Sequence, residues 1–255
     1  MNAAVRLEFL KLHRSPPVRV ASIILVVVVP MMSAALLALT RMDSDSMLAA
    51  KIAPLLHDDG WGGLTGFAAQ ILSVGGLLAI GVVVSWVFGR EFTEKMFGSL
   101  FATPTPRENI ALAKLLVLIT WSTALSAITA AATLLSGLLI GLGLPDVKAW
   151  DGAARIVVIG ILTAMLALPL ALVASAGRGY LVAIAALLGV VVITQVTVAL
   201  GAGAWFPYAS PGLWAGLGGP ELAAGVTALQ LLLAVPIGIA AAWGTWWWWR
   251  RAHVR

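Results

Sequence analysis

Long apolar runs alternate with short polar segments along the whole chain. Each run is long enough to cross a bilayer as a helix, since a crossing takes roughly 20 residues. The pattern predicts six transmembrane helices, at residues 20–40, 66–89, 115–142, 156–177, 180–200 and 222–249. We therefore expect an all-α membrane protein, with residues 1–255 forming a single transmembrane domain.

The composition supports this interpretation. Hydrophobic residues make up 61% of the chain and charged residues 11%, and the mean hydropathy is +1.00. A soluble domain of this size would have too little polar surface to face water. We expect a multi-pass protein of a plasma membrane, and the excess of arginine over lysine together with abundant alanine suggests a bacterial one. The absence of cysteine excludes disulfides and thiolate metal sites.

The basic residues divide unevenly between the two sides of the predicted bundle. With both termini inside, the inner segments hold twelve lysines and arginines, and the outer segments hold four: Arg41, Lys51, Lys148 and Arg155. Because cytoplasmic segments carry the excess of basic residues, this count predicts cytoplasmic N- and C-termini. The net charge of +5 thus reflects membrane topology, and we expect no nucleic-acid partner.

Residues 1–19 form a basic segment before the first span. Val5, Phe9 and Leu12 share one face if the segment is helical, and the pair Pro16-Pro17 ends it. We interpret it as an amphipathic interfacial helix. The alternative is a disordered basic tail that only fixes the orientation.

The longest charged passage, residues 90–110, separates the second and third spans. Its apolar positions share one helical face: Phe92, Met96 and Leu100. Its polar positions fall on the opposite arc: Glu91, Glu94 and Lys95. The prolines of Thr103-Pro104-Thr105-Pro106 should stop the helix, and Glu108 follows Thr105 at the spacing of a capping box. We expect a cytoplasmic loop that contains a short amphipathic surface helix.

Residues 201–220 are apolar but rich in glycine, proline and aromatic residues, which suits neither a spanning helix nor an aqueous loop. Two interpretations stay open. The segment dips into the outer half of the membrane as short broken helices, or it lies at the interface as an aromatic-anchored loop. The last span ends in four tryptophans, residues 246–249, followed by Arg250 and Arg251, which is typical of an interfacial girdle.

The residues that several functions require are missing from the sequence. None of the six predicted spans holds a charged residue or histidine, which disfavours ion-coupled transport. No P-loop and no catalytic constellation is present, so the chain is not expected to be an enzyme. His57, Asp58 and Asp59 are adjacent, and three adjacent side chains rarely converge on one ion, so we interpret them as a solvated loop.

The central passage resembles the first cytoplasmic loop of ABC-2-type transporter permeases. The resemblance rests on Glu91 and Glu94, on the Leu-Phe-Ala-Thr-Pro run at residues 100–104, and on Arg107 and Lys114. The opening residues 8–15 resemble the amino-terminal helix of the same family. The resemblance implies a permease that pairs with a second permease and with two cytosolic ABC ATPase subunits. ATP and Mg would bind those ATPase subunits, and this chain would hold no cofactor.

The resemblance also implies that the loop helix docks on the ATPase. The residues of that coupling contact would be Arg90, Glu91, Glu94, Lys95, Phe97 and Arg107. The alternative for the same helix is a solvated surface element that only anchors the loop.

Polar side chains within the spans are candidates for a substrate path: Gln70, Thr194, Gln195 and Gln230. Their other interpretation is structural, because amides in lipid commonly bond between helices. Ser122, Ser126 and Ala130 form a small-residue stripe that favours helix packing. The leading hypothesis is the permease of an ATP-driven exporter for a hydrophobic or amphipathic compound (a drug, a peptide antibiotic or a lipid). A non-transporting membrane scaffold is the alternative.

Overall fold

The computed structural model describes residues 2–42, 47, 58, 60–94 and 106–251. Every regular element in these ranges is a helix, and six helical segments are long and apolar enough to cross a membrane. They are Pro16–Arg41, Trp61–Thr93, Arg107–Leu139, Val147–Ala176, Tyr180–Ala199 and Ala228–Arg251. The expected fold class is confirmed, and the chain is a multi-pass membrane protein.

The N-terminal segment and the first span meet at the proline pair. α1 (Asn2–Arg14) is followed by the extended residue Ser15, and α2 (Pro16–Ile23) begins directly after it. Prolines suit the first turn of a helix, where the N–H has no intrahelical partner. The pair therefore begins the spanning helix as well as ending α1, so the first span starts earlier than residue 20. A π-helical turn, η1 (Ile24–Val28), leads into α3 (Val29–Met42), which contains Pro30.

The second span is one continuous helical rod built from α5 (Trp61–Ile71), the π-helical turn η3 (Leu72–Gly76) and α6 (Leu77–Thr93). Asp58 fixes its start, because Oδ1 accepts hydrogen bonds from the backbone N–H groups of Gly60 and Gly63 at 2.9 and 2.8 Å. The helix thus begins before the predicted residue 66. The third span is α7 (Arg107–Leu139), which starts after Pro106 and well before the predicted residue 115.

The fourth span differs from its prediction at the outer end. The span was predicted to begin at residue 156, but α8 (Val147–Ala167) begins nine residues earlier. The reason is a cap, since the Asp146 carboxylate accepts a hydrogen bond from the Ala149 N–H at 2.9 Å. Pro169 then starts α9 (Pro169–Ala176), and α10 (Tyr180–Ala199) forms the fifth span.

The apolar stretch after α10 is a series of short helices. They are η5 (Gly203–Trp205), α11 (Ser210–Trp214), α12 (Pro220–Ala224) and α13 (Ala228–Leu232), followed by the long α14 (Ala234–Arg251). Glycines with positive φ lie at two of the breaks, Gly201 before η5, and Gly216, Gly218 and Gly219 between α11 and α12. The short broken helices are therefore found, and α11 packs against α8 and η3 with Leu213 buried. The predicted sixth span at 222–249 is shorter, because α12 lies apart from the spanning helix.

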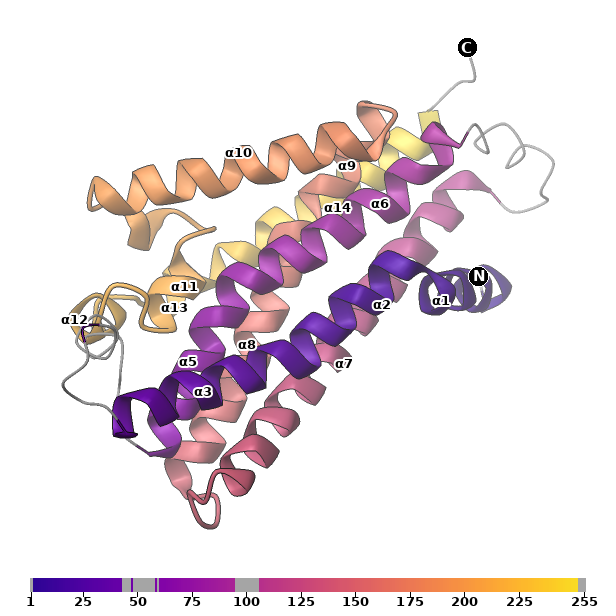
Figure 1. Ribbon diagram of the computed structural model, residues 1–255. Coiled ribbons are helices and arrows are strands. Elements are labelled where there is room, and N and C mark those ends of the chain that lie inside the picture. The colour runs from indigo at the N-terminus through magenta and orange to yellow at the C-terminus, as the bar shows by residue number, and fades with distance from the viewer. Residues whose placement is uncertain (1, 43–46, 48–57, 59, 95–105, 252–255) are drawn as a thin grey trace.

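The long helices lie side by side in one slanted bundle (Figure 1). The end of α6, the start of α7, the end of α14 and the whole of α1 gather at one end, while α11 and α12 lie at the other (Figure 1). α10 runs along the outside, against α6 and α9.

The small-residue stripe on α7 packs against α8, where Gly160 faces Ser126 without room for a side chain. Ser122, Ser126 and Ala130 are all buried, so their packing role is confirmed.

Candidate functional site

The two helices that carry the central charged passage come together at one end of the bundle. α6 ends at Thr93 and α7 begins at Arg107, so residues 94–106 connect them. α1 packs against α7 at this same end. Two helices that follow each other in the sequence and a third, α1, that lies far from them in the sequence therefore meet at the base of one loop.

Lys114 is the centre of this meeting point. Its ammonium Nζ lies 2.8 Å from Glu91 Oε1 on α6 and 2.9 Å from Glu8 Oε2 on α1. All three side chains are at least nine-tenths buried, with exposed fractions of 2%, 5% and 6% for Lys114, Glu91 and Glu8. We call Glu8, Glu91 and Lys114 the buried triad. Because each helix contributes one charge, the triad fixes the positions of α1, α6 and α7 relative to one another.

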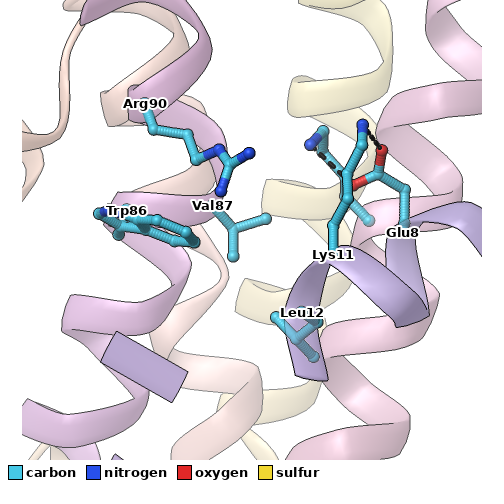
Figure 2. Close-up of a pocket in the computed structure, with 7 residues that line it drawn as sticks. Glu8, Lys11, Leu12, Trp86, Val87 and Arg90 are labelled. Atoms are coloured by element: carbon cyan, nitrogen blue, oxygen red, sulfur yellow. Dashed lines mark hydrogen bonds and ion pairs between the residues drawn. The ribbon is translucent and has the colours of Figure 1, made fainter. Parts of the chain in front are cut away.

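A second lysine balances the charge of the triad. Lys11 Nζ lies 2.7 Å from Glu8 Oε1 across one turn of α1, and its side chain is about one-third exposed. Figure 2 shows Lys11 and Glu8 side by side on α1, facing the α6 residues Trp86 and Arg90. Burial by itself raises the pKa of Glu8, but the ammonium groups of Lys114 and Lys11 outweigh it and hold that pKa below its ordinary value. Glu8 is therefore an ionised carboxylate at neutral pH.

Aromatic side chains hold the end of α6 from the other side. The Trp249 ring of α14 is fully buried, donates a hydrogen bond from Nε1 to Ser175 Oγ at 2.9 Å, and meets Phe88 edge to face. Phe92 contacts the Trp248 and Trp249 rings. The expected tryptophan girdle is therefore only partly interfacial, because Trp249 belongs to the core. This packing makes the last turn of α6 a rigid base for the loop.

The six predicted coupling residues occupy different places. Arg90 lies over the Trp86 ring at 4.5 Å, Glu94 is exposed just after α6, and Arg107 is half-buried in the first turn of α7. Lys95 and Phe97 lie outside the described residues, as do Met96, Leu100 and Thr105. The N-cap residue of α7 is Pro106, and no side-chain hydrogen bond caps this helix start.

Glu91 corrects the expected amphipathic pattern. It was placed on the polar arc of a surface helix, but it lies in the last turn of the spanning helix α6 and points into the bundle. The physical reason is Lys114, whose charge gives a buried carboxylate its partner.

The sequence analysis did not assign site roles to Glu8 and Lys114. Glu8 lies in the predicted basic segment 1–19, and Lys114 belongs to the residues that carry the family resemblance. A signal existed for Glu8, which falls on the same helical arc as Val5 and Leu12, the apolar face of α1. An acid on an apolar face needs a buried cationic partner.

The candidate path residues lie on three different helices: Gln70 on α5, Thr194 and Gln195 on α10, and Gln230 on α13. Gln230 caps its own helix, because Oε1 accepts from the Thr227 N–H at 2.8 Å, and Thr194 Oγ1 donates to the Val190 carbonyl at 2.7 Å. Gln70 is buried in α5, and Gln195 is exposed on α10. The bonds of Thr194 and Gln230 stay within their own helices, so neither the bonding between helices nor the path role is decided by them.

The site holds charges in place and presents no nucleophile or base aimed at a ligand cavity. The space bordered by Glu8, Lys11, Leu12, Trp86, Val87, Arg90 and Lys114 is about 10 Å³, the size of one water molecule at most. What this arrangement can do is mechanical, since a displacement of the loop acts on three helices together.

A family model described as ABC-2 family transporter protein matches residues 4–196 of the chain. The match covers α1, the first four spans, most of the fifth, and all three residues of the buried triad. No curated protein and no solved structure matches the chain.

Proposed function

Because the chain belongs to the ABC-2 family of transporter proteins and is a membrane permease component of an ABC transporter, we propose that it serves an ATP-driven exporter. The cargo class that we propose is a hydrophobic or amphipathic compound, such as a drug, a peptide antibiotic or a lipid. Two cytosolic ABC ATPase subunits bind ATP and Mg and hydrolyse the nucleotide. A second permease, of the same or a different sequence, completes the membrane part.

The proposed orientation places the triad end of the bundle in the cytoplasm. The described basic residues at that end include Arg6, Arg14, Arg178, Arg250 and Arg251, whereas Arg41, Lys148 and Arg155 lie toward the other end. This division supports cytoplasmic termini by the positive-inside rule. The loop at residues 94–106 then faces the ATPase subunits.

The single observation that carries the proposal is the buried triad. An ATPase that pushes on the loop moves the end of α6 and the start of α7, which lie on either side of it. The Lys114 ion pairs with Glu91 and Glu8 make α6, α7 and α1 move together. Packed elements of this kind shift between discrete arrangements as rigid bodies. The loop is thus coupled to two spans and to the amino-terminal helix.

Within this proposal the predicted coupling residues divide into two groups. Glu94 is exposed and Arg90 and Arg107 are half-buried, so these three side chains border the surface offered to the ATPase. For Lys95 and Phe97, which lie outside the described residues, the coupling role rests on the family resemblance. Glu91 acts from inside the bundle through Lys114.

The cargo class is supported by the chemistry of the spans. Each spanning segment is strongly apolar, and the buried polar groups of the described spans are mostly hydroxyls bonded to their own helix, such as Ser126, Thr133 and Thr245. Gln70, Thr194, Gln195 and Gln230 stay candidate path positions. A route with few charges favours a cargo that partitions into lipid.

The test is co-purification from native membranes of the wild-type chain beside Glu94→Arg. We expect a stoichiometric P-loop ATPase with the wild type and its loss with the variant, because the exposed carboxylate is replaced by a bulky cation. Glu221→Arg, at an exposed glutamate at the other end of the bundle, is the matched control and should keep the ATPase. An ATPase bound to neither sample would contradict the transporter and favour the scaffold.

A further inference from the structure

Two adjoining hollows form one groove between α1, α2, η1 and α7. Their volumes are about 390 and 400 Å³, and they share His13, Ser22, Ile23 and Trp121. The groove opens outward, since Ile23 and Ile128 on its rim are 59% and 52% exposed. In a membrane this opening faces lipid.

The groove carries a guanidinium group at one of its ends. Arg19, in the first turn of α2, borders only the hollow at the α1–α2 junction, together with Phe9, Leu12 and Val18, whereas His13 lines both hollows. The other end is lined by Val26, Val27, Leu125 and Ile128. From Arg19 to Val27 the helix advances about 12 Å at 1.5 Å per residue. The groove thus runs from the basic edge of the span into its apolar part. Its length is comparable to that of the half of an acyl chain next to the headgroup.

Two hydrogen bonds shape the groove. Trp121 Nε1 donates to Ser22 Oγ at 3.3 Å, which ties α7 to α2 across its floor. Arg19 Nε donates to the His13 carbonyl at 3.2 Å, which holds the guanidinium group at the α1–α2 junction. Within the described residues Arg19 forms no ion pair, so its charge is available to an anion. Arg14, in the last turn of α1, adds positive charge nearby.

We propose that this groove binds an anionic phospholipid. The phosphate lies at Arg19 and His13, and one acyl chain lies along Ile23, Val27 and Ile128. Charge complementarity selects this occupant, because a basic residue at the membrane surface attracts anionic headgroups and the apolar remainder matches a chain. The bound lipid braces the junction between α1 and the first span, the same α1 that carries Glu8. The inference needs only a membrane-spanning chain, so it stands apart from the transport proposal.

The test is native mass spectrometry of the delipidated, detergent-solubilised protein, titrated with phosphatidylglycerol or phosphatidylcholine of identical acyl chains. We expect the wild type to prefer phosphatidylglycerol about five-fold, the effect of one basic residue near an anionic surface. Arg19→Gln should lose the preference, and Arg19→Lys should keep it. Arg6→Gln, at an exposed arginine of α1 outside the groove, is the matched control and should behave as the wild type.

A second variant tests the apolar part of the groove. Ile23→Trp fills the shared middle of the two hollows, and we expect at least a five-fold loss of binding of both lipids. Equal lipid binding by the wild type, Arg19→Gln and Ile23→Trp would overturn the proposal. If Ile23→Trp changes only the oligomeric state and no lipid binding, a second copy of the chain covers the groove and the proposal also fails.

Discussion

Lys114 and Glu91 form a buried ion pair of 2.8 Å, although they stand on opposite sides of the charged passage that joins the second and third spans. Glu8 completes the site from the amino-terminal helix at 2.9 Å. Ion pairs therefore hold together the helix ends between which the loop is connected. This relationship makes the loop base a definite target for mutation.

Lys114→Met should be strongly destabilising, because it leaves the carboxylates of Glu8 and Glu91 buried without their common cation. Removal of one partner from a buried pair costs about 3–5 kcal/mol. Thermal unfolding in detergent, followed by tryptophan fluorescence, measures the loss. The matched control is Lys148→Met, which breaks the exposed Lys148–Asp58 pair and should cost less than about 1 kcal/mol. Similar losses in both variants would contradict the central role of Lys114.

The triple variant Glu8→Gln, Glu91→Gln, Lys114→Met separates charge from packing. It removes every charge of the triad together, so no carboxylate is left buried without a cation. We expect it to recover most of the stability that Lys114→Met loses, as neutral replacements of buried ion networks commonly do. In the assembled transporter it should still hydrolyse ATP but transport less per ATP. Unchanged transport per ATP would show that the triad is structural only.

The contribution of Glu8 should depend on pH in the acid range. Its pKa in the folded protein lies below the ordinary value of 4.5, so the ionised group stabilises the fold fully above about pH 4.5. This stabilisation is lost as the pH falls from there through the lowered pKa. The difference in Tm between wild type and Glu8→Gln should be constant from pH 7 to 5 and shrink below 4.5. A difference that already shrinks between pH 7 and 6 would refute this assignment.

Gly160→Val should disturb the α7–α8 contact. Any side chain at this position collides with Ser126, and overpacking of a tight contact costs about 1–3 kcal/mol. Ser126→Gly in the same chain should restore part of the loss by opening space on α7. Gly189→Val on α10 is the matched control, since no atom lies within 4 Å of a Cβ there. Thermal unfolding of the four proteins gives the comparison, and equal losses at both glycines would argue against this packing.

Trp249→Phe should loosen the end of α6. It removes the 2.9 Å hydrogen bond from the indole to Ser175, whose hydroxyl keeps its bond to the Ala171 carbonyl, so the cost is about 0.5–1.5 kcal/mol. Trp243→Phe, at a tryptophan that is 63% exposed on the same helix, should change the stability by less than 0.5 kcal/mol, roughly the effect of an ordinary surface substitution. Stabilities are again compared by thermal unfolding. A larger effect at Trp243 would show that Trp249 is not the residue that ties α14 to the bundle.

Where local features dominate, the sequence analysis anticipated the structure. The broken helices after α10 follow from glycines and prolines that cannot continue a helix. Pro16 and Pro169 each begin a helix in the structure, a role that the hydropathy pattern did not predict for either of them. The boundaries were less predictable. Asp58 and Asp146 extend helices into polar segments that hydropathy alone assigns to loops. A cap depends on a few polar atoms, and a hydropathy average over twenty residues does not detect them.

The sequence by itself determined the class of protein, six apolar helices, and the resemblance that the family match confirms, because hydrophobic run length and local motifs are properties of neighbouring residues. Only the tertiary structure decided that Glu8, Glu91 and Lys114 form one site. They are separated by 106 and 23 positions along the chain, and no periodicity relates them. Their charges are tolerable in the bundle only when helix packing brings both carboxylates within 3 Å of the Lys114 ammonium. The pairing is therefore a property of the packed helices, and the pattern of each separate segment does not contain it.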